Sequence, residues 1–258
     1  MIRQLGTFLL AIGFDPRRLL ASTKFVPVFA KQAVETYSKS RKQGDFQFAW
    51  LPVLSDRYHQ SGVAKGHYFH QDLWAARAIY SRAPSVHIDV GSRVDGFVAH
   101  LLSFREVHVI DVRPLASNVP GLKFLQADLM KEAITLPKAD SVSCLHALEH
   151  FGLGRYGDPL DVNGWRKGVK NLAAMLTEGG ILYVSVPVGS SQRIEFNAHR
   201  VFHPRTIVEE FKNNGCELVE FSAVDDSGDF VTQADLEHCS YQFGCGCFVF
   251  QKRTVTQE

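Results

Sequence analysis

The stretch Val86-His87-Ile88-Asp89-Val90-Gly91 is a short apolar run that ends in an acid and a glycine. A run of this length, bounded by a turn residue, predicts a buried β-strand, and the glycine permits a sharp turn after it. Similar runs follow at residues 107–111, 123–127, 141–145 and 181–186, and helical patterns at 97–104 and 164–176 lie among them. Strands that alternate with helices predict an α/β fold with a mostly parallel sheet.

The last part of the chain predicts how this sheet ends. A helical pattern at 204–213 precedes two further apolar runs, at 217–224 and 247–252, with no strong helical pattern between them. Two strands without a crossover helix predict an antiparallel hairpin. The predicted fold is therefore a Rossmann-like, seven-stranded, mostly parallel sheet with a terminal antiparallel hairpin.

The first residues differ from this pattern. The sequence predicts a helical or irregular N-terminal extension at 1–65 and an α/β domain at 66–258. A helical pattern from Leu19 to Ser40 is interrupted at Pro27, and the polar segment Ser38–Gly44 predicts a linker or a solvated turn. Asp72 is predicted to cap a helix over residues 73–82.

The apolar segment Phe8–Phe14 is too short to cross a bilayer. Two arrangements fit it. One is an interfacial helix, with Leu9, Leu10 and Ile12 in lipid, that makes a peripheral contact with the inner face of the membrane. The other is a helix packed on the main domain or on a partner.

Composition excludes few classes of function. The chain has 258 residues, 45 % of them hydrophobic and 21 % charged, as in an ordinary soluble globular protein. The net charge is +1 and no basic stripe stands out, so the composition predicts no nucleic-acid partner.

Five cysteines occur at irregular spacings, without a C-x-x-C pair, and predict reduced thiols in a cytoplasmic protein. A metal site made by His238, Cys239, Cys245 and Cys247 is the alternative. Structural zinc sites show two ligand pairs at a characteristic spacing. Because Cys245 and Cys247 alternate along an apolar run, they fit one face of a strand better, and the sequence predicts no metal.

Polar residues follow the first three predicted strands, where ligands bind in such sheets. Gly91 would let the backbone approach a ligand closely, but the surrounding residues match neither a dinucleotide fingerprint nor a P-loop. Asp111 lies 22 positions beyond Asp89, close to the spacing of an acid that accepts from ribose hydroxyls. Asp128 ends the third strand, where a carboxylate can accept from the amine of adenine while Leu129 packs on the ring.

These motifs, in order, resemble the class I S-adenosylmethionine-dependent methyltransferases. The resemblance spans about Ser85 to Pro187, and its most specific part is Leu176-Thr177-Glu178-Gly179-Gly180-Ile181-Leu182-Tyr183-Val184-Ser185-Val186-Pro187. More narrowly, residues 66–72, 89–98 and 151–159 resemble a family of uncharacterised proteins first catalogued from nematodes, whose bacterial members tend to accompany surface-polysaccharide genes.

The resemblance implies S-adenosylmethionine as the cofactor. It implies Asp89 and Gly91 near the methionine part, Asp111 on the ribose, Asp128 at the adenine and Leu145 on the methyl-transfer face. The full set of cofactor-binding residues predicted is Asp89, Gly91, Ser92, Arg93, Asp111, Asp128, Leu129 and Leu145. Arg93 stands where the class usually has a second glycine, so its side chain either crowds the cofactor carboxylate or contacts it as a cation.

The segment after the fourth strand supplies the predicted catalytic residues His146, Glu149 and His150. A neutral histidine can take a proton from an acceptor near pH 7, and Glu149 can orient it or act as a base itself. The alternative is that Glu149 and His150 only cap the next segment. His146 to His150 also matches H-x-x-E-H, an inverted zinc-protease signature, which requires a long helix.

The predicted reaction is O-methylation of a saccharide or of another small polar hydroxyl compound. Its predicted substrate-binding residues are His70, Tyr156, His199, Arg200 and His203, and the last three also fit solvated loop residues. The alternative function is a non-catalytic binding or scaffold protein that keeps the fold, and Arg93 is the residue that favours it.

Overall fold

The computed structural model describes residue 10 and residues 13–44, 46–54, 57, 59–132 and 134–254. The chain divides into two compact units, Met1–Val63 and Ala64–Glu258. The predicted interfacial helix centres on Phe8–Phe14, most of which lies outside the described residues. Among the helices that are described, none is both long and apolar enough to cross a membrane.

The first unit contains helices α2 (Pro16–Thr23) and α3 (Val26–Gln43). Pro27 lies in the first turn of α3, where its missing N–H leaves no helical hydrogen bond unmade. The prediction of a linker at Ser38–Gly44 is wrong, because α3 continues to Gln43 and ends at Gly44, whose φ is 75°. Its polar residues make local contacts, such as the ion pair between Lys39 and Glu35.

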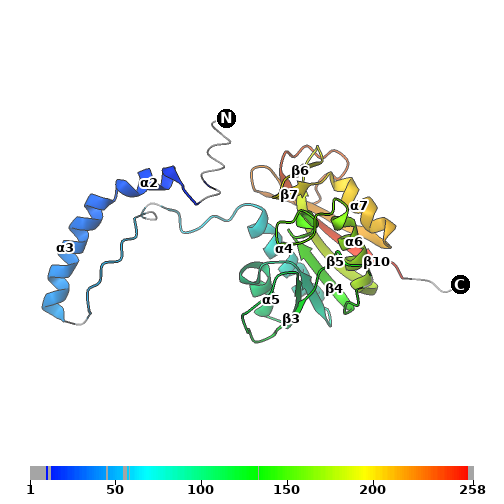
Figure 1. Cartoon of the computed structure of the whole chain (residues 1–258), viewed down its shortest axis with the longest axis horizontal. Helices are drawn as coiled ribbons and strands as arrows, with labels where there is room; N and C mark the ends of the chain where they lie inside the picture. Colours follow the sequence, from blue (N-terminus) through cyan, green and yellow to red (C-terminus); the bar gives the residue numbers. More distant parts are fainter. Residues whose placement is uncertain are drawn as a thin grey trace. The chain divides into compact units, whose positions relative to one another are not determined.

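The second unit is built on one eight-stranded sheet with the order β3-β2-β1-β4-β5-β10-β8-β9 (Figure 1). The strands are β1 (His87–Val90), β2 (Val107–Asp111), β3 (Leu122–Gln126), β4 (Ala139–Leu145), β5 (Leu176–Val188), β8 (Cys216–Val224), β9 (Phe230–Val231) and β10 (Gly244–Lys252). The first five pair in parallel, and β10 pairs antiparallel with β5 and β8. The predicted fold class is confirmed, with the two-residue strand β9 added at the edge.

Helices cover both faces of this sheet. Helices α6 (Gly164–Met175) and α7 (Pro204–Asn213) pack on one face, whereas α4 (His67–Arg82) and α5 (Ala99–Leu102) pack on the other (Figure 1). Each face of the sheet has its own hydrophobic core, and strand β5 contributes to both. Leu182 and Val184 join the core under α6 and α7, and Tyr183 joins the core under α4 and α5. Successive side chains of β5 are thus buried on opposite faces, which explains the continuous apolar run in its sequence.

Helix α4 differs from its prediction. It begins at His67, and Gly66 enters it with a φ of 89°. Asp72 lies inside the helix, buried, and accepts a hydrogen bond from Gln71. The prediction that Asp72 caps a helix at residue 73 is therefore wrong, because the unusual entry through a glycine left no polar cap to recognise.

Strand order places the site. Strand β1 pairs with β2 on one side and with β4 on the other, so the chain runs outward from β1 in two directions. Ligands of open α/β sheets bind beyond the carboxyl ends of the strands at such a reversal. The strand order therefore predicts a ligand site at the loops after β1 and β4.

Candidate functional site

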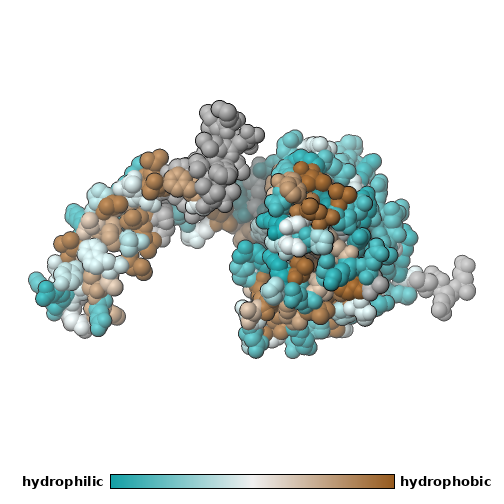
Figure 2. Space-filling view, in the orientation of Figure 1, coloured by the Kyte–Doolittle hydropathy of each residue, from teal (hydrophilic) through white to brown (hydrophobic). Residues whose placement is uncertain are grey.

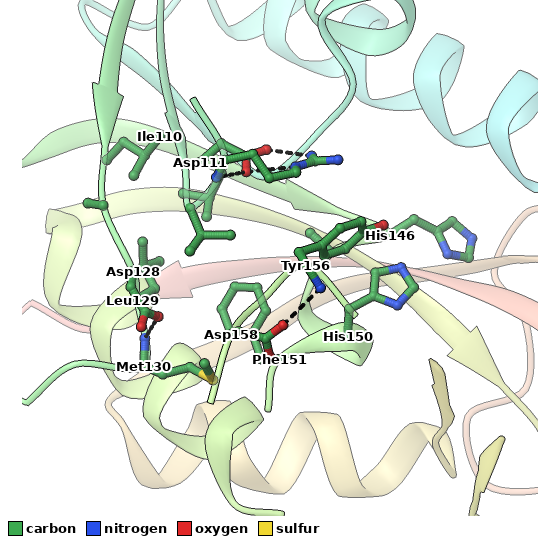
Figure 3. Close-up of a pocket in the computed structure, with 16 residues that line it drawn as sticks. Ile110, Asp111, Asp128, Leu129, Met130, His146, His150, Phe151, Tyr156 and Asp158 are labelled. Atoms are coloured by element: carbon green, nitrogen blue, oxygen red, sulfur yellow. Dashed lines mark hydrogen bonds and ion pairs between the residues drawn. The ribbon is translucent and has the colours of Figure 1, made fainter. Parts of the chain in front are cut away.

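A pocket lies where the loops after β1, β2, β3 and β4 meet (Figure 3). Its space is about 540 Å³, counting the part open to solvent. Seven of the residues predicted for cofactor, catalysis or substrate line it: Gly91, Asp111, Asp128, Leu129, His146, His150 and Tyr156. The parallel strands thereby bring residues up to 65 positions apart in the chain to one pocket.

Gly91 brings the first loop close to the fourth. Its φ is 77°, and a Cβ built on it would lie 2.7 Å from the Cβ of Ala147. Side chains do not approach so closely, and few residues adopt this φ without strain. Glycine is therefore required where the loop after β1 meets Ala147.

Asp89 lies beneath the pocket and does not line it. Its Oδ1 accepts hydrogen bonds from Ser92 Oγ at 2.8 Å and from Ser143 Oγ at 2.6 Å, and its Oδ2 accepts from the Ser92 amide at 3.2 Å. Complete burial raises the pKa of Asp89 to about 6. Asp89 and Ser92 thus position the loop that carries Gly91, and neither forms part of the pocket wall.

A buried histidine continues this network. Ser143 donates its only hydroxyl proton to Asp89, so its oxygen accepts from His87 Nε2 at 3.1 Å, and His87 Nδ1 lies 2.8 Å from Ser141 Oγ. Burial lowers the pKa of His87 to about 3, which keeps the ring neutral. The polar groups under the pocket therefore satisfy one another without water.

Arg93 neither crowds the pocket nor enters it. Its guanidinium donates to Asp95 at 3.0 and 2.6 Å, and its side chain is 71 % exposed. Arg93 does not line the main pocket but lines a neighbouring hollow with Asp111 and Arg113, so its side chain does not fill the main pocket.

Asp111 lines the pocket, and Arg113 holds it. The carboxylate accepts from Arg113 Nε at 3.0 Å and from a terminal guanidinium nitrogen at 2.6 Å. The same guanidinium lies 4.5 Å from the ring centre of Tyr156, at the pocket mouth (Figure 3). Sequence reasoning missed Arg113, although an arginine two residues after an acid at a strand end can reach back to it.

Asp128 and Leu129 form the far wall. Asp128 Oδ1 accepts from the amide of Met130 at 2.8 Å, so this carboxylate also stabilises its own turn. Leu129 is buried in the main core. By contrast, Leu145 lies in the core on the opposite face of the sheet, away from the pocket.

His146 and Glu149 form a buried pair. His146 Nδ1 lies 2.6 Å from Glu149 Oε1, and the His146 backbone has a φ of 48°. Burial by itself would lower the pKa of His146, but the negative charges of Cys245 and Glu149 outweigh it and raise that pKa. Burial raises the pKa of the Cys245 thiol well above its ordinary value, so Glu149 supplies the charge that acts near pH 7.

His150 lines the pocket, and its Nε2 lies 3.7 Å from Glu149 Oε1. Its Nδ1 donates to the carbonyl of Ala198 at 2.7 Å, and burial lowers its pKa. A neutral ring with Nδ1–H engaged keeps its basic lone pair on Nε2, so His150 has the protonation state of a general base at neutral pH. Residues 148–150 form a single 3₁₀ turn, so the long helix of an inverted zinc protease is absent from this segment.

The other residues predicted to bind the second substrate lie outside this pocket. The prediction for Arg200 is wrong: its side chain is buried, and it donates to the carbonyls of Glu149, Phe151, Asp161 and Val162. His203 accepts from the amide of Arg205 and caps α7. His199 follows the short strand β6 (Arg193–Glu195) at the start of β7 (His199–Val201), and His70 stacks on Phe230.

Comparison with known proteins gives one family match. Residues 124–234 match the model of the family described as "Caenorhabditis protein of unknown function, DUF268". No match was found among curated proteins.

Solved structures with a similar fold include methyltransferases. N-methyltransferase NodS from Bradyrhizobium japonicum WM9 is 14 % identical, with a TM-score of 0.52, and the alignment covers 74 % of this chain and 100 % of that one. A 1,6-didemethyltoxoflavin-N1-methyltransferase from Burkholderia thailandensis, solved with S-adenosylhomocysteine, is 14 % identical, with a TM-score of 0.51 and 91 % of each chain covered. The [4+2]-cyclase SpnF is 11 % identical, with a TM-score of 0.53, 75 % of this chain and 85 % of that one.

Proposed function

We propose that this chain is an S-adenosylmethionine-dependent methyltransferase. It has the class I methyltransferase fold, and part of it matches the model of an uncharacterised family named from Caenorhabditis. The observation that carries the proposal is the pocket itself. Gly91, Asp111 and Asp128 follow three successive strands, and the sheet brings them to one wall. A protein that only kept the fold would have no need of this combination.

The pocket residues fit the cofactor. The two oxygens of Asp111 match the two hydroxyl donors of a ribose, and Leu129 offers an apolar surface to a base. The missing side chain at Gly91 lets the loop after β1 pack against Ala147 at the edge of the pocket. S-adenosylmethionine would supply an electrophilic methyl group bound to a positively charged sulfur.

His150 is the proposed proton acceptor for the second substrate. It lines the pocket as a neutral imidazole, with Nδ1–H held by the Ala198 carbonyl. Nε2 can therefore take the proton of a hydroxyl group as that oxygen becomes a nucleophile. We propose a saccharide or a small polar hydroxyl compound as the acceptor, supported by this base and by the surface-polysaccharide context of the family that the sequence resembles.

Calorimetric titration with S-adenosylhomocysteine tests the cofactor site. We expect the unmodified chain to bind it and Asp111→Asn to bind roughly 10- to 100-fold more weakly, because hydrogen bonds to a charged acceptor contribute about 1.5–3 kcal/mol. Asp95→Asn, at an exposed acid of the first loop, is the matched control and should bind as the unmodified chain does. Equal binding by Asp111→Asn would refute the ribose assignment.

A screen of sugars with radiolabelled S-adenosylmethionine tests the reaction. With an accepted substrate, His150→Gln should lower kcat by about 10²–10⁴ and leave S-adenosylhomocysteine affinity unchanged. Transfer to amines alone would exclude the hydroxyl acceptor while leaving the cofactor assignment intact.

One observation favours the second candidate, a non-catalytic binding or scaffold protein. Arg113 donates to both oxygens of Asp111, so a ribose must compete with it for that carboxylate. In that case a well-folded sample would bind neither S-adenosylmethionine nor S-adenosylhomocysteine.

A further inference from the structure

Three side chains of metal-binding type converge beside the pocket. His67 begins α4, His146 follows β4 and Cys245 lies in β10. One ligand atom from each lies within 4.8 Å of the others. Three elements distant in sequence thus supply the cluster, as in a site that only the folded chain can make.

One nitrogen of this cluster has only a thiol beside it. The His146 side chain is 6 % exposed, its Nδ1 is held by Glu149, and its Nε2 has no nitrogen or oxygen partner within the described part of the chain, where the Cys245 thiol is its neighbour. Leaving a buried polar atom unpaired costs about 1–3 kcal/mol. The His67 ring stacks on His146, with centres 5.2 Å apart and planes inclined by 11°. The unpaired nitrogen therefore faces a region that already holds two further metal-binding groups.

We infer that His67, His146 and Cys245 bind a zinc ion. Two imidazole nitrogens and a thiolate suit zinc, and three protein ligands leave a fourth, open position of the kind found in catalytic zinc sites. Zinc–ligand distances are about 2.0–2.3 Å, so the three side chains must close by about 1 Å on binding. The Cys245 thiol and the His146 imidazolium would each release a proton to solvent as they become ligands.

The neighbours of the three ligands fit this assignment. Metal-binding histidines usually donate their second nitrogen to a carboxylate or a carbonyl, and Glu149 holds His146 Nδ1 in this way. On the other side, the Cys245 thiol donates to Gln71 Oε1 at 3.8 Å, and this oxygen also accepts from the Ser185 hydroxyl. The thiolate would give up this hydrogen bond on binding zinc, so the fit rests on Glu149.

The role of the ion, unlike its binding, rests on the methyltransferase function proposed above. Because His146 lines the pocket, zinc bound there would lie next to the acceptor. Its open position would take an oxygen of the acceptor and lower the pKa of that hydroxyl group. His150 would then receive the proton, and His146 would be a ligand and not a base.

Titration of the metal-free full chain with Zn²⁺, in competition with a chromophoric chelator, tests the inference. We expect one equivalent to bind, and Cys245→Ser and His67→Gln each to weaken binding by at least roughly tenfold. Co²⁺ should give a thiolate-to-cobalt absorption band that Cys245→Ser removes. Cys216→Ser, at a buried thiol of β8, and His70→Gln, one turn along α4, are the matched controls and should bind as the unmodified chain does.

Folding and cofactor binding are measured on the same samples. His67 is only partly buried, so His67→Gln should keep the fold even where a change at the fully buried Cys245 does not. Absence of zinc binding, or unchanged binding in His67→Gln, would overturn the inference. Zinc binding without S-adenosylhomocysteine binding would overturn the proposed function alone, and the reverse result would overturn the zinc site alone.

Discussion

Asp89 connects the buried sheet to the loop that forms the pocket. Its carboxylate is fully buried and accepts three hydrogen bonds, all from serines. These neutral donors offset burial only in part, so the pKa of Asp89 stays raised, at about 6. The folded protein therefore favours the protonated form of this residue more than the unfolded chain does.

Asp89 predicts a distinct dependence of stability on pH. Since its pKa rises from 3.8 to about 6 on folding, its stabilising contribution is complete below about pH 4 and is lost as the pH rises through 6. The unfolding free energy of the unmodified chain, minus that of Asp89→Asn, should fall by roughly 2 kcal/mol between pH 4 and pH 7. Urea unfolding of both chains across this range gives the difference, and a flat profile would contradict the assignment.

Arg113 predicts a gain of affinity on its removal. Its ion pair with Asp111 is partly exposed, with the arginine side chain 40 % accessible, and such pairs contribute about 0–1 kcal/mol. Arg113→Gln frees the carboxylate for a ribose, so S-adenosylhomocysteine should bind roughly two- to fivefold more tightly in calorimetry. Arg155→Gln, which also removes a cation beside Tyr156, is the control. Weaker binding by Arg113→Gln would show that the arginine contacts the ligand.

At the scale of elements, the loop after β4 forms one side of the pocket mouth. Gly152 has a φ of 78°, and a Cβ there would collide with the backbone carbonyl of Asp161. Arg200 reinforces the same fold of the loop by donating to carbonyls at both of its ends. The loop is therefore held from within, and this rigidity places Phe151 and Tyr156 at the pocket.

Two alanine substitutions separate strain from collision in this loop. Gly157 has a φ of 80° but open space around its missing side chain, so Gly157→Ala should lose about 1–2 kcal/mol of stability and retain ligand binding. Gly152→Ala carries the same strain and also displaces the loop, so it should weaken S-adenosylhomocysteine binding by more than about tenfold. Thermal unfolding and calorimetry measure both effects. Equal behaviour of the two variants would show that the collision at Gly152 is relieved without moving the pocket wall.

The sequence predicts those features of the site that depend on strand ends. A local apolar run predicts a buried strand, and parallel pairing brings the residues at the strand ends together. The positions of Gly91, Asp111 and Asp128 at the site could therefore be predicted from the sequence. The direction of a side chain, by contrast, depends on contacts with distant parts of the chain. Arg200 reads as an exposed loop cation but is buried by a loop some 40 residues earlier.

The His67–His146–Cys245 cluster could not be predicted from the sequence either. Sequence spacing groups Cys245 with Cys247, as alternating residues of one strand, and this strand is β10. Its approach to His67 and His146 depends on β10 inserting between β5 and β8, and on α4 beginning earlier than its pattern indicates. Neither fact has a local signal in the chain.

At the scale of the whole molecule, the site is confined to one unit. Every residue that lines the pocket, and every member of the proposed zinc cluster, lies within Ala64–Glu258. A shortened chain of residues 64–258 should therefore fold with a cooperative thermal transition and bind S-adenosylhomocysteine within about twofold of the full chain. Loss of binding by a folded sample of the shortened chain would show that residues 1–63 complete the site.

The first unit carries apolar surface without an assigned role. Figure 2 shows this surface along α2 and α3, where Leu19, Leu20, Val26 and Val34 are all exposed. Lysines of the same segment, Lys24, Lys31 and Lys39, add positive charge. Apolar side chains beside lysines are typical of a helix that lies on an anionic membrane surface.

This surface predicts binding to lipid vesicles. The full chain should sediment with vesicles that contain an anionic lipid, more weakly as salt rises, because the lysine contribution is screened. The shortened chain 64–258 should stay in solution, and Leu19→Asp with Leu20→Asp in the full chain should abolish sedimentation while leaving S-adenosylhomocysteine binding unchanged. Self-association of the full chain without vesicle binding would instead assign this surface to a second copy, since an apolar surface of this kind is normally covered by some partner.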